Sequence, residues 1–187
     1  MDVTGPGEKH RLVTREVRLT PLDEQLLEPL LSVAVAEAEP DEVMPPVDAP
    51  AGWSRARMDA FRQFYRAHFG GLDGPTGNLM YAIVQDGDVV GMIRLGRVRG
   101  EPDTLETGLW LGKSTRGQGI GLIALRLALA EAIQAGACRV VADTRSENLP
   151  AVSLLRRCGA VLDSDGAAVR AEIRLGVTED VDAVDAG

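Results

Sequence analysis

The chain of 187 residues has about the length of one domain, and its 45% apolar and 26% charged residues are typical of an ordinary globular protein. Lys and Arg number 20 against 28 Asp and Glu, which gives a formal net charge of −8. This sign does not suit nucleic-acid phosphates or anionic lipids, so we expect neither nucleic acid nor membrane as a partner. A cationic substrate remains compatible with the charge.

No stretch approaches the roughly 18 unbroken apolar residues of a membrane-spanning helix, and residues 1–11 lack the apolar core of a signal peptide. The sequence therefore predicts a cytoplasmic protein. Cys138 and Cys158 lie in apolar runs without metal-ligand spacing, so we expect buried, reduced thiols. The two histidines, His10 and His68, are too few for a His-rich metal centre, and no metal is expected.

The pattern predicts a single domain over residues 10–176, with loose tails at 1–9 and 177–187 that show no periodicity. At the front of this domain, apolar and polar residues first alternate as in a strand, and Thr20-Pro21 then marks the start of a helix. A segment with four prolines follows, and after it apolar residues recur at helical spacing. We expect a strand at Arg11–Leu22, a helix at Asp23–Ala38 with Pro29 as its kink point, a loop at Glu39–Gly52 and a helix at Arg55–Phe69.

The rest of the domain alternates between strands and apolar helices, with a hairpin signal at Asp86-Gly87, a turn at Gly100–Asp103 and helix ends at Gly136 and Gly159. The predicted strands are Leu79–Gln85, Val89–Val98, Thr104–Leu111, Arg139–Ala142, Ala160–Leu162 and Ala168–Leu175, and the predicted helices are Gly121–Ala135 and Pro150–Cys158. The order β-α-α-β-β-β-α-β-α-β-β predicts an α/β (α+β) fold, a mixed central β-sheet with helices on both faces.

A glycine-rich turn, Arg116-Gly117-Gln118-Gly119-Ile120-Gly121, lies between a predicted strand and the longest apolar helix. Free amides in the first helical turn can face an anion, and glycines let it approach the backbone closely. Each helix-dipole contact contributes only about 0.3–1 kcal/mol, so several amides must act together. A glycine-rich connector without a ligand is the alternative, which the position between strand and helix disfavours.

Two other phosphate-binding motifs fit this turn less well. A P-loop requires Gly-Lys-Ser/Thr where this chain has Gly119-Ile120-Gly121. Residues 119–124 do match the dinucleotide fingerprint G-x-G-x-x-A, and Asp143 ends the next strand. However, the turn begins several residues after its strand, and only about 45 residues follow Asp143, too few for a second nucleotide-binding half.

Around this turn the sequence resembles the GCN5-related N-acetyltransferase (GNAT) family, whose cofactor motif R/Q-x-x-G-x-G/A is met by Arg116, Gly119 and Gly121. Leu105–Gly112 resembles the strand that comes before this motif in one branch of the family. That branch is similar to ribosomal-protein N-terminal acetyltransferases and aminoglycoside N-acetyltransferases. Asn148 and the segment Leu154–Ala160 resemble a downstream family motif. The likeness covers Leu79–Leu175 and extends to the front third only by element order.

This resemblance implies a GNAT-like fold and acetyl-CoA as the cofactor. The pyrophosphate would lie on the amides from Gly117 to Leu122, and the pantetheine would pair with the backbone of Leu109–Leu111, where two parallel strands separate in the family. The implied cofactor-binding residues are Leu109, Trp110, Leu111, Arg116, Gly117, Gln118, Gly119, Ile120, Gly121, Leu122 and Asn148.

The sequence departs from the family at the position of its usual general acid. Many relatives carry a tyrosine seven residues after the asparagine, but here this position is Leu155. Ser153 on the same predicted helix is a substitute catalytic residue, although an exposed helix serine is the simpler interpretation. The usual aromatic residue after the final glycine is also replaced, by Ala160.

Glu106 is the predicted proton acceptor. An amine attacks a thioester only when it is unprotonated, and holding a lysine-like ammonium neutral at pH 7 costs about 4–5 kcal/mol. Strand alternation places Glu106, Gly108 and Trp110 on one face of the predicted strand, so the carboxylate can take the proton directly or through an ordered water. A structural salt bridge from Glu106 to Arg97 or Arg99 is the alternative.

We expect the first two predicted helices and their loop to form the acceptor pocket, because this region contains both acidic and aromatic residues. The alternative is that most of these acids are solvated surface residues. The acids and aromatics of this region are Glu37, Glu39, Asp41, Glu42, Trp53, Asp59 and Tyr65. The predicted substrate-binding set is Glu42, Trp53, Tyr65, Trp110 and Asp143.

The resemblance and the charge together predict an acetyl-CoA-dependent N-acetyltransferase that acts on a primary amine of a small cationic molecule. An aminoglycoside-type antibiotic, hence a role in antibiotic resistance, is the leading expectation because a protein of charge −8 attracts a polycation. A protein N-terminal acetyltransferase and a non-catalytic acyl-CoA-binding sensor are the alternatives. A homodimer is compatible with the family.

Overall fold

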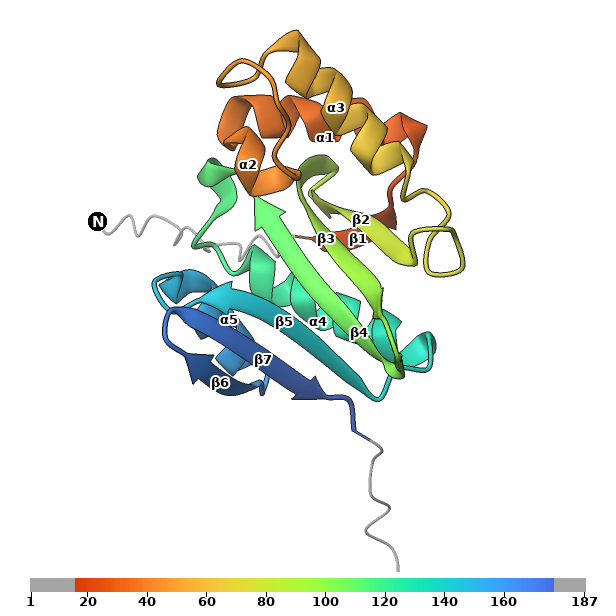
Figure 1. The fold of residues 1–187 in the computed structure, drawn as a ribbon, viewed down its shortest axis with the longest axis vertical. Coiled ribbons are helices and arrows are strands. Elements are labelled where there is room, and N and C mark those ends of the chain that lie inside the picture. The colour runs from red at the N-terminus through yellow and green to blue at the C-terminus, as the bar shows by residue number, and fades with distance from the viewer. Residues whose placement is uncertain (1–15, 177–187) are drawn as a thin grey trace, which may run out of the picture.

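The predicted order of elements is found along the chain (Figure 1). The structure, a computed structural model, describes residues 16–176, so the predicted tails and the start of the predicted first strand lie outside the described residues. The elements are β1 (Val17–Pro21), α1 (Glu24–Glu37), α2 (Pro40–Val43), α3 (Arg55–Arg66), β2 (Asn78–Gln85), β3 (Asp88–Val98), β4 (Glu101–Leu111), the 3-10 turn η1 (Lys113–Thr115), α4 (Ile120–Gln134), β5 (Arg139–Arg145), α5 (Leu149–Arg157), β6 (Val161–Asp165) and β7 (Ala168–Arg174).

The strands form one mixed sheet, as expected from the sequence, and their order across the sheet is β1-β2-β3-β4-β5-β7-β6. Neighbouring strands are antiparallel except β4 and β5, which run parallel. This parallel pairing joins Thr104–Glu106 to Arg139–Val141 and then stops, although both strands continue. The two strands therefore separate in the middle of the sheet, and Figure 1 shows them diverging toward their C-terminal ends.

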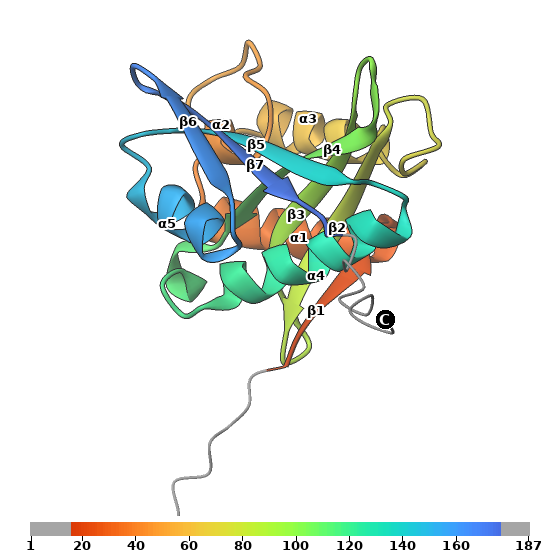
Figure 2. The same ribbon diagram turned by 90° about the horizontal axis from the view of Figure 1, so that it is seen from below.

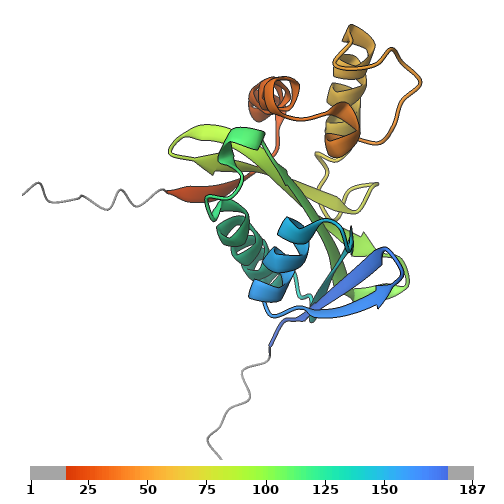
Figure 3. The ribbon, with the colours of Figure 1, turned by 90° about the vertical axis from the view of Figure 1, so that its left-hand side faces the viewer.

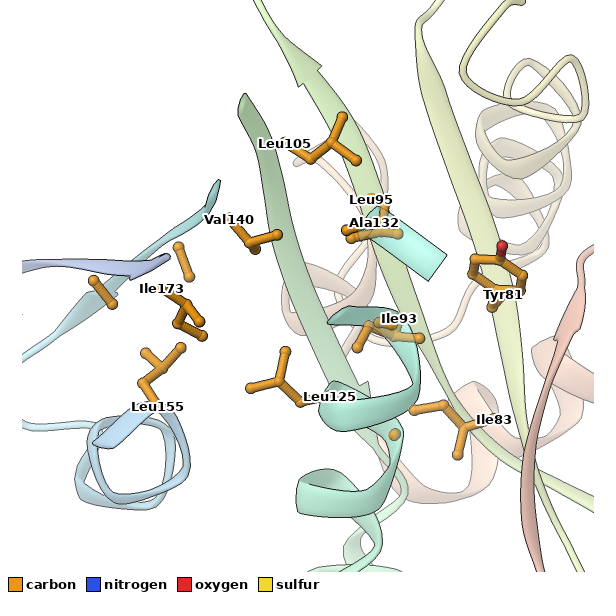
Figure 4. Packing of buried hydrophobic residues seen from close by; sticks show 14 of the residues in the cluster. Tyr81, Ile83, Ile93, Leu95, Leu105, Leu125, Ala132, Val140, Leu155 and Ile173 are labelled. Carbon is orange, nitrogen blue, oxygen red and sulfur yellow. The ribbon is translucent and has the colours of Figure 1, made fainter. Parts of the chain in front are cut away.

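Helices cover both faces of the sheet, which confirms the predicted layering. Helix α4 lies along one face with α5 beside it (Figure 2), whereas α1 and α3 lie on the opposite face (Figure 3). Strand alternation divides the buried side chains between two cores. In β3, Ile93 and Leu95 belong to the core under α4 (the α4 core), where Figure 4 shows Leu95 beside Ala132 of α4. Met92, between them in the strand, belongs to the core under α1 and α3.

A short helix, α2, interrupts the predicted proline-rich loop. Pro40 occupies its first turn, where the missing N–H group is not needed, and Glu39 and Glu42 form a reciprocal capping box. The prediction of a continuous loop is therefore wrong at these residues. Helix α1 contains Pro29 and continues to Glu37 without a break, and its N-cap Asp23 accepts two backbone hydrogen bonds.

Strand β4 begins at Glu101, earlier than predicted. A tight turn at Arg99-Gly100 joins β3 to β4, and Gly100 has a φ of 81°, which favours glycine. A register irregularity after Arg97 lets Val98 pair with Glu101, so that Pro102 is accommodated at an exposed position near the strand's start. The predicted turn over residues 100–103 is therefore wrong beyond Gly100.

Both cysteines are free, as predicted, but only one is partly buried. Burial raises the pKa of the Cys158 thiol. Cys138 is exposed, so its predicted burial is wrong; the neighbouring Ala137 points inward and Cys138 therefore points outward. Over residues 16–176, no helix is long and apolar enough to cross a membrane.

Candidate active site

Glu106, Gly108 and Trp110 lie on the face of β4 that α1 and α3 cover, since Trp110 belongs to the core beneath those helices. On the adjacent strand β3, Gly96 pairs with Glu106, and Arg94 pairs with Gly108. The intervening residues of β4 face α4 and belong to the other core, as Leu105, Leu109 and Leu111 do. The predicted alternation of β4 is confirmed.

Glu106 forms an ion pair with Arg94, between carboxylate Oε1 and guanidinium Nη2. Nη1 of the same guanidinium donates to Asn78 Oδ1 at 2.9 Å. The Arg94 and Glu106 side chains are 29% and 41% exposed, so the pair is held by the sheet and still accessible. The prediction that Glu106 pairs with Arg97 or Arg99 is wrong. Gly96 lies opposite Glu106, and Arg94 is the next residue of β3 on the same face of the sheet. Arg97 pairs instead with an aspartate outside the site.

A cavity of about 310 Å³ lies beside this ion pair, between α2 and the sheet. Residues 41–45 of α2 and the following loop form one wall, and α3 contributes Phe64. The sheet forms the other wall with Met80, Met92, Arg94 and residues 108–110. The lining combines apolar side chains with the charged side chains of Asp41, Glu42 and Arg94.

A larger hollow of about 660 Å³ lies at the opposite end of β4, away from the separated strands. Its lining includes Glu101, Arg139 and Glu172, which already form ion pairs with one another. Arg139 also donates to the Thr104 hydroxyl at 2.6 Å. Because β4 and β5 are still paired at that end, the smaller cavity, which lies beside the separated strands, is the candidate acceptor site.

The acids at the smaller cavity are also matched by arginines. Asp41 Oδ1 lies 3.2 Å from Arg57 Nη1, and Glu42 Oε2 lies 3.6 Å from Arg116 Nη2. The charges of these carboxylates are thus balanced locally. In the part of the chain that the structure describes, no three His, Cys, Asp or Glu side chains gather closely enough to hold a metal ion.

Tyr65 is a core residue and cannot contact a substrate, so this prediction is wrong. Its side chain is fully buried, its hydroxyl donates to the Val43 carbonyl at 2.8 Å and accepts from Trp110 Nε1 at 3.0 Å, and burial raises the pKa of its phenol. Trp53 also serves the fold: its Nε1 donates to the Ala38 carbonyl and its ring packs against an α3 phenylalanine. Among the predicted aromatics, only Trp110 lines the cavity.

The remaining predicted acids lie outside the cavity lining. Asp143 of β5 is exposed and lies 3.5 Å from Arg170 of β7. Asp59 forms an i,i+3 ion pair on the exposed side of α3. Glu37 and Glu39 contact η1 instead, so Asp41 and Glu42 are the members of the predicted acidic set that the structure brings to the cavity.

The glycine-rich turn leads directly into α4, as expected. Gly119 is the helix N-cap with a φ of 82°, and Gly117 has a φ of 74°, conformations that side chains of other residues rarely adopt. Within residues 16–176, the amides of Gly117, Gly119, Ile120 and Gly121 have no protein acceptor. The turn thus presents several unpaired N–H groups at the positive end of a 15-residue helix.

The Arg116 and Gln118 side chains hold this region together. Arg116 Nε donates to the Leu111 carbonyl at 2.9 Å, and Gln118 Nε2 donates to the Ser114 carbonyl at 2.7 Å. The Ser114 amide donates to Glu37 Oε2 at 2.7 Å, and hydrogen bonds from the Ser114 side chain and amide hold the pKa of Glu37 below its usual range. These contacts fix the segment between β4 and the glycine-rich turn to α1.

The backbone around Leu109–Leu111 lies where β4 has separated from β5. The last pair across the two strands is Glu106 with Val141, so beyond it β4 keeps its β3 partner but has no β5 partner. Leu109 and Trp110 also line the smaller cavity. The separated strands and the cavity therefore meet at the same residues of β4.

Helix α5 contributes Asn148 and Ser153. Asn148 is the N-cap and its Oδ1 accepts from the Ala151 amide at 3.3 Å. Ser153 is exposed on the helix, whereas Leu155, at the family's tyrosine position, is 5% exposed and belongs to the α4 core. The side chain at position 155 therefore packs in the core and offers no hydroxyl group to the site.

Arg94, Met80 and Met92 line the cavity but were not among the predicted site residues. Arg94 interrupts the apolar run Val89–Leu95, and a charge inside a buried strand requires a partner, so the run itself was a usable signal. The methionines Met80 and Met92 gave no such signal, because ordinary core packing explains them equally well.

Comparison with known proteins agrees with this geometry. The family model for Acetyltransferase (GNAT) family matches residues 39–160, which contain the cavity, the separated strands and the glycine-rich turn. A search of curated protein sequences finds no match to the chain.

Several solved acetyltransferase structures share the fold. Mycobacterium smegmatis RimJ in complex with CoA-disulfide aligns with a TM-score of 0.67 and 24% identity over 84% of this chain and 81% of that chain. The dodecameric spermidine N-acetyltransferase from Vibrio cholerae gives 0.64 and 14% over 85% and 94%. Campylobacter jejuni N-acetyltransferase PseH in complex with acetyl coenzyme A gives 0.62 and 13% over 86% and 100%. With a family match across well over half of its length, the chain belongs to the GNAT family of acetyl-CoA-dependent N-acetyltransferases.

Proposed function

We propose that this acetyltransferase modifies a primary amine of a small cationic acceptor that enters the cavity beneath α2. One observation carries the proposal: Gly108, Leu109 and Trp110 line the cavity and also lie just beyond the last pairing between β4 and β5. An amine in the cavity and a ligand between the separated strands would therefore meet along the same three residues.

The chain's own groups fit acetyl-CoA at the separated strands and the glycine-rich turn. The unpaired amides of Gly117, Gly119, Ile120 and Gly121 suit an anionic pyrophosphate, and the backbone of residues 107–111 has free hydrogen-bonding capacity for an amide-containing arm. Arg116 and Gln118 would act indirectly, by holding the turn. When bound, acetyl-CoA supplies an acyl group activated as a thioester.

Glu106 is the proposed base. One of its carboxylate oxygens is engaged by Arg94, and the other is available to accept a proton from the amine or from a bridging water. Ser153 remains the proposed proton donor to the leaving thiolate, since Leu155 has no ionisable group. Asn148, as N-cap of α5, would fix the start of the helix that carries Ser153.

The acceptor class has two candidates. The net charge of −8 favours a polycation such as an aminoglycoside, with Glu42 at the cavity and Asp143 on β5 as contacts. A peptide N-terminus is favoured by a different observation, the pairing of Asp41, Glu42 and Glu106 with arginines, which leaves little uncompensated negative charge around the cavity.

The proposal is tested by Glu106→Gln with Glu101→Gln as matched control, since Glu101 is also an arginine-paired carboxylate of β4 but lies at its other end. We expect Glu106→Gln to lower kcat at neutral pH by about 100-fold or more and to leave acetyl-CoA affinity unchanged. Glu101→Gln should keep kcat. An unchanged pH-rate profile in Glu106→Gln would exclude its role as base.

A separate measurement distinguishes the enzyme from a sensor. We expect acetyl-CoA to raise the melting temperature and at least one amine in a panel of aminoglycosides and peptides to release free thiol. Stabilisation without thiol release would favour the non-catalytic sensor, and no stabilisation would contradict acetyl-CoA binding altogether.

A further inference from the structure

We propose that Arg94 and Glu106 together form a clamp for an α-amino acyl group, an amine with a carbonyl or carboxylate oxygen on the adjacent carbon, and that the cavity takes its apolar side chain. This inference rests on the proposed function, because it identifies the acceptor of the same site. It makes Arg94 a substrate-binding residue.

The first support is the unused hydrogen-bonding capacity of Arg94. A guanidinium carries several N–H donors, and here one nitrogen serves Glu106 and another serves Asn78. Within residues 16–176 its remaining N–H groups have no acceptor, and the side chain lines the cavity. A ligand oxygen in the cavity can therefore accept from Arg94 without breaking either existing contact.

Two glycines create the space for this arrangement. A Cβ atom on Gly96 would lie 2.4 Å from Asn78 Oδ1 and 2.9 Å from Arg94 Nη1, so a larger residue would push these two side-chain ends out of the observed arrangement. Gly108, opposite Arg94, has no atom within 4 Å of its virtual Cβ, which leaves open space on the cavity side. One glycine thus seats the arginine and the other leaves room for a ligand.

The charges around the pair select the ligand. Arg94 presents a cation and the free oxygen of Glu106 presents an anion on the same face of the sheet, a zwitterion whose complement is an ammonium next to an oxygen acceptor. A polycation would meet the positive charge of Arg94 at the point where its amine must react. An α-amino acyl group satisfies both charges at once.

The cavity wall selects the side chain. Met44, Pro45, Phe64, Met80, Met92 and Trp110 supply a largely apolar lining, and its methionines can adapt to several shapes. A volume of about 310 Å³ is at the lower end for small-molecule sites, enough for one amino-acid side chain. Asp41 and Glu42 also line the cavity, but both are paired with arginines, so the apolar residues are left to contact the ligand side chain.

The test compares four acceptors with acetyl-CoA: leucinamide, free leucine, isopentylamine and an aminoglycoside. Isopentylamine carries the side chain of leucinamide without the carbonyl group. Because an α-amino group has a lower pKa than an alkylamine, kcat/KM is compared per concentration of unprotonated amine, here and in the variants. On this scale we expect kcat/KM for leucinamide or leucine to exceed that for isopentylamine by about tenfold or more, because isopentylamine cannot accept a hydrogen bond from Arg94. Preference for leucinamide would point to a peptide-like acceptor, and preference for leucine to a free amino acid.

Arg94→Gln should reduce the ratio of leucinamide to isopentylamine kcat/KM, per concentration of unprotonated amine, to about one, and should weaken equilibrium binding of leucinamide measured without turnover. The matched control is Arg139→Gln, which removes another arginine paired with a β4 glutamate but lies outside the cavity and should keep the ratio. Acetyl-CoA affinity serves as the test of an intact fold.

Three results would overturn the inference: an unchanged ratio in Arg94→Gln, a higher kcat/KM for isopentylamine than for leucinamide, or a higher kcat/KM for the aminoglycoside. In each of these cases amines are still acetylated, so the proposed function survives. If no amine of any class is acetylated while acetyl-CoA binds, the proposed function and the clamp both fail.

Discussion

The proposed cofactor site and the proposed acceptor site of this protein are formed by different groups, backbone amides in one and side chains in the other. On the cofactor side, the glycine-rich turn over residues 116–121 offers backbone amides, and two of its glycines adopt positive φ angles. On the acceptor side, the cavity is made of side chains from α2, α3 and three strands, and its charges are matched in ion pairs. A site made of backbone amides suits a constant group such as a phosphate, whereas a site made of side chains can be altered by substituting single residues.

The largest expected effect comes from adding a side chain to the backbone site. Gly119 and Gly136 stand at the two ends of α4 with φ values of 82° and 83°, and neither virtual Cβ has an atom within 4 Å. Alanine should cost each about 1–2 kcal/mol of stability, because both adopt the left-handed conformation. Only Gly119→Ala should also weaken acetyl-CoA binding, by about tenfold or more, as measured by calorimetry.

Equal acetyl-CoA affinity in the Gly119→Ala and Gly136→Ala proteins would break the comparison, since the first glycine would then serve only the helix end.

A smaller effect on ligand binding is expected from two buried tyrosines on opposite faces of the sheet. Tyr65→Phe leaves the Val43 carbonyl and the Trp110 N–H without their partner, so we expect a loss of about 1–3 kcal/mol of unfolding free energy and a raised KM for the acceptor. Tyr81→Phe removes a hydrogen bond to Glu131 in the α4 core and should leave acceptor KM unchanged. Chemical denaturation and steady-state kinetics measure the two quantities. If both variants change acceptor KM alike, the two faces are not independent.

The smallest effect concerns alkaline pH. Burial, followed by the hydrogen bond to Glu131, raises the pKa of Tyr81 to about 12, above the ordinary tyrosine value near 10. Between these values the unfolded chain loses this proton while the folded chain keeps it, so stability should fall as pH rises from about 10 to 12. Tyr81→Phe should flatten this part of the stability curve, relative to the wild type, in thermal melts across the range. An unchanged slope would show that Tyr81 does not titrate differently on folding.

The same contrast explains what could be predicted from the sequence. The glycine-rich turn was predicted because its residues are consecutive, and the face of Glu106 was predicted because strand alternation is local. The partner of Glu106 was mistaken because the register of the β3–β4 hairpin decides between Arg94 and Arg97. A proline at a predicted turn, Pro102, concealed the true start of β4.

The acceptor pocket was predicted least well, for the same physical reason. Trp53 and Tyr65 were assigned to it by composition, but an indole N–H and a phenol can equally satisfy backbone carbonyls in a core, as both do here. The overall charge of −8 also carried little information about the cavity, because the sum does not reveal that Asp41, Glu42 and Glu106 each lie beside an arginine.

The separation of β4 from β5 after Glu106 and Val141 gives the sheet an edge in its interior. An outer edge of a sheet invites any passing strand, and proteins protect such edges against aggregation. This inner edge is confined between two strands that remain paired on their other sides, with β3 and β7. Its unpaired backbone is therefore flanked on both sides by strands of the same sheet, whereas an outer edge has such a neighbour on one side only.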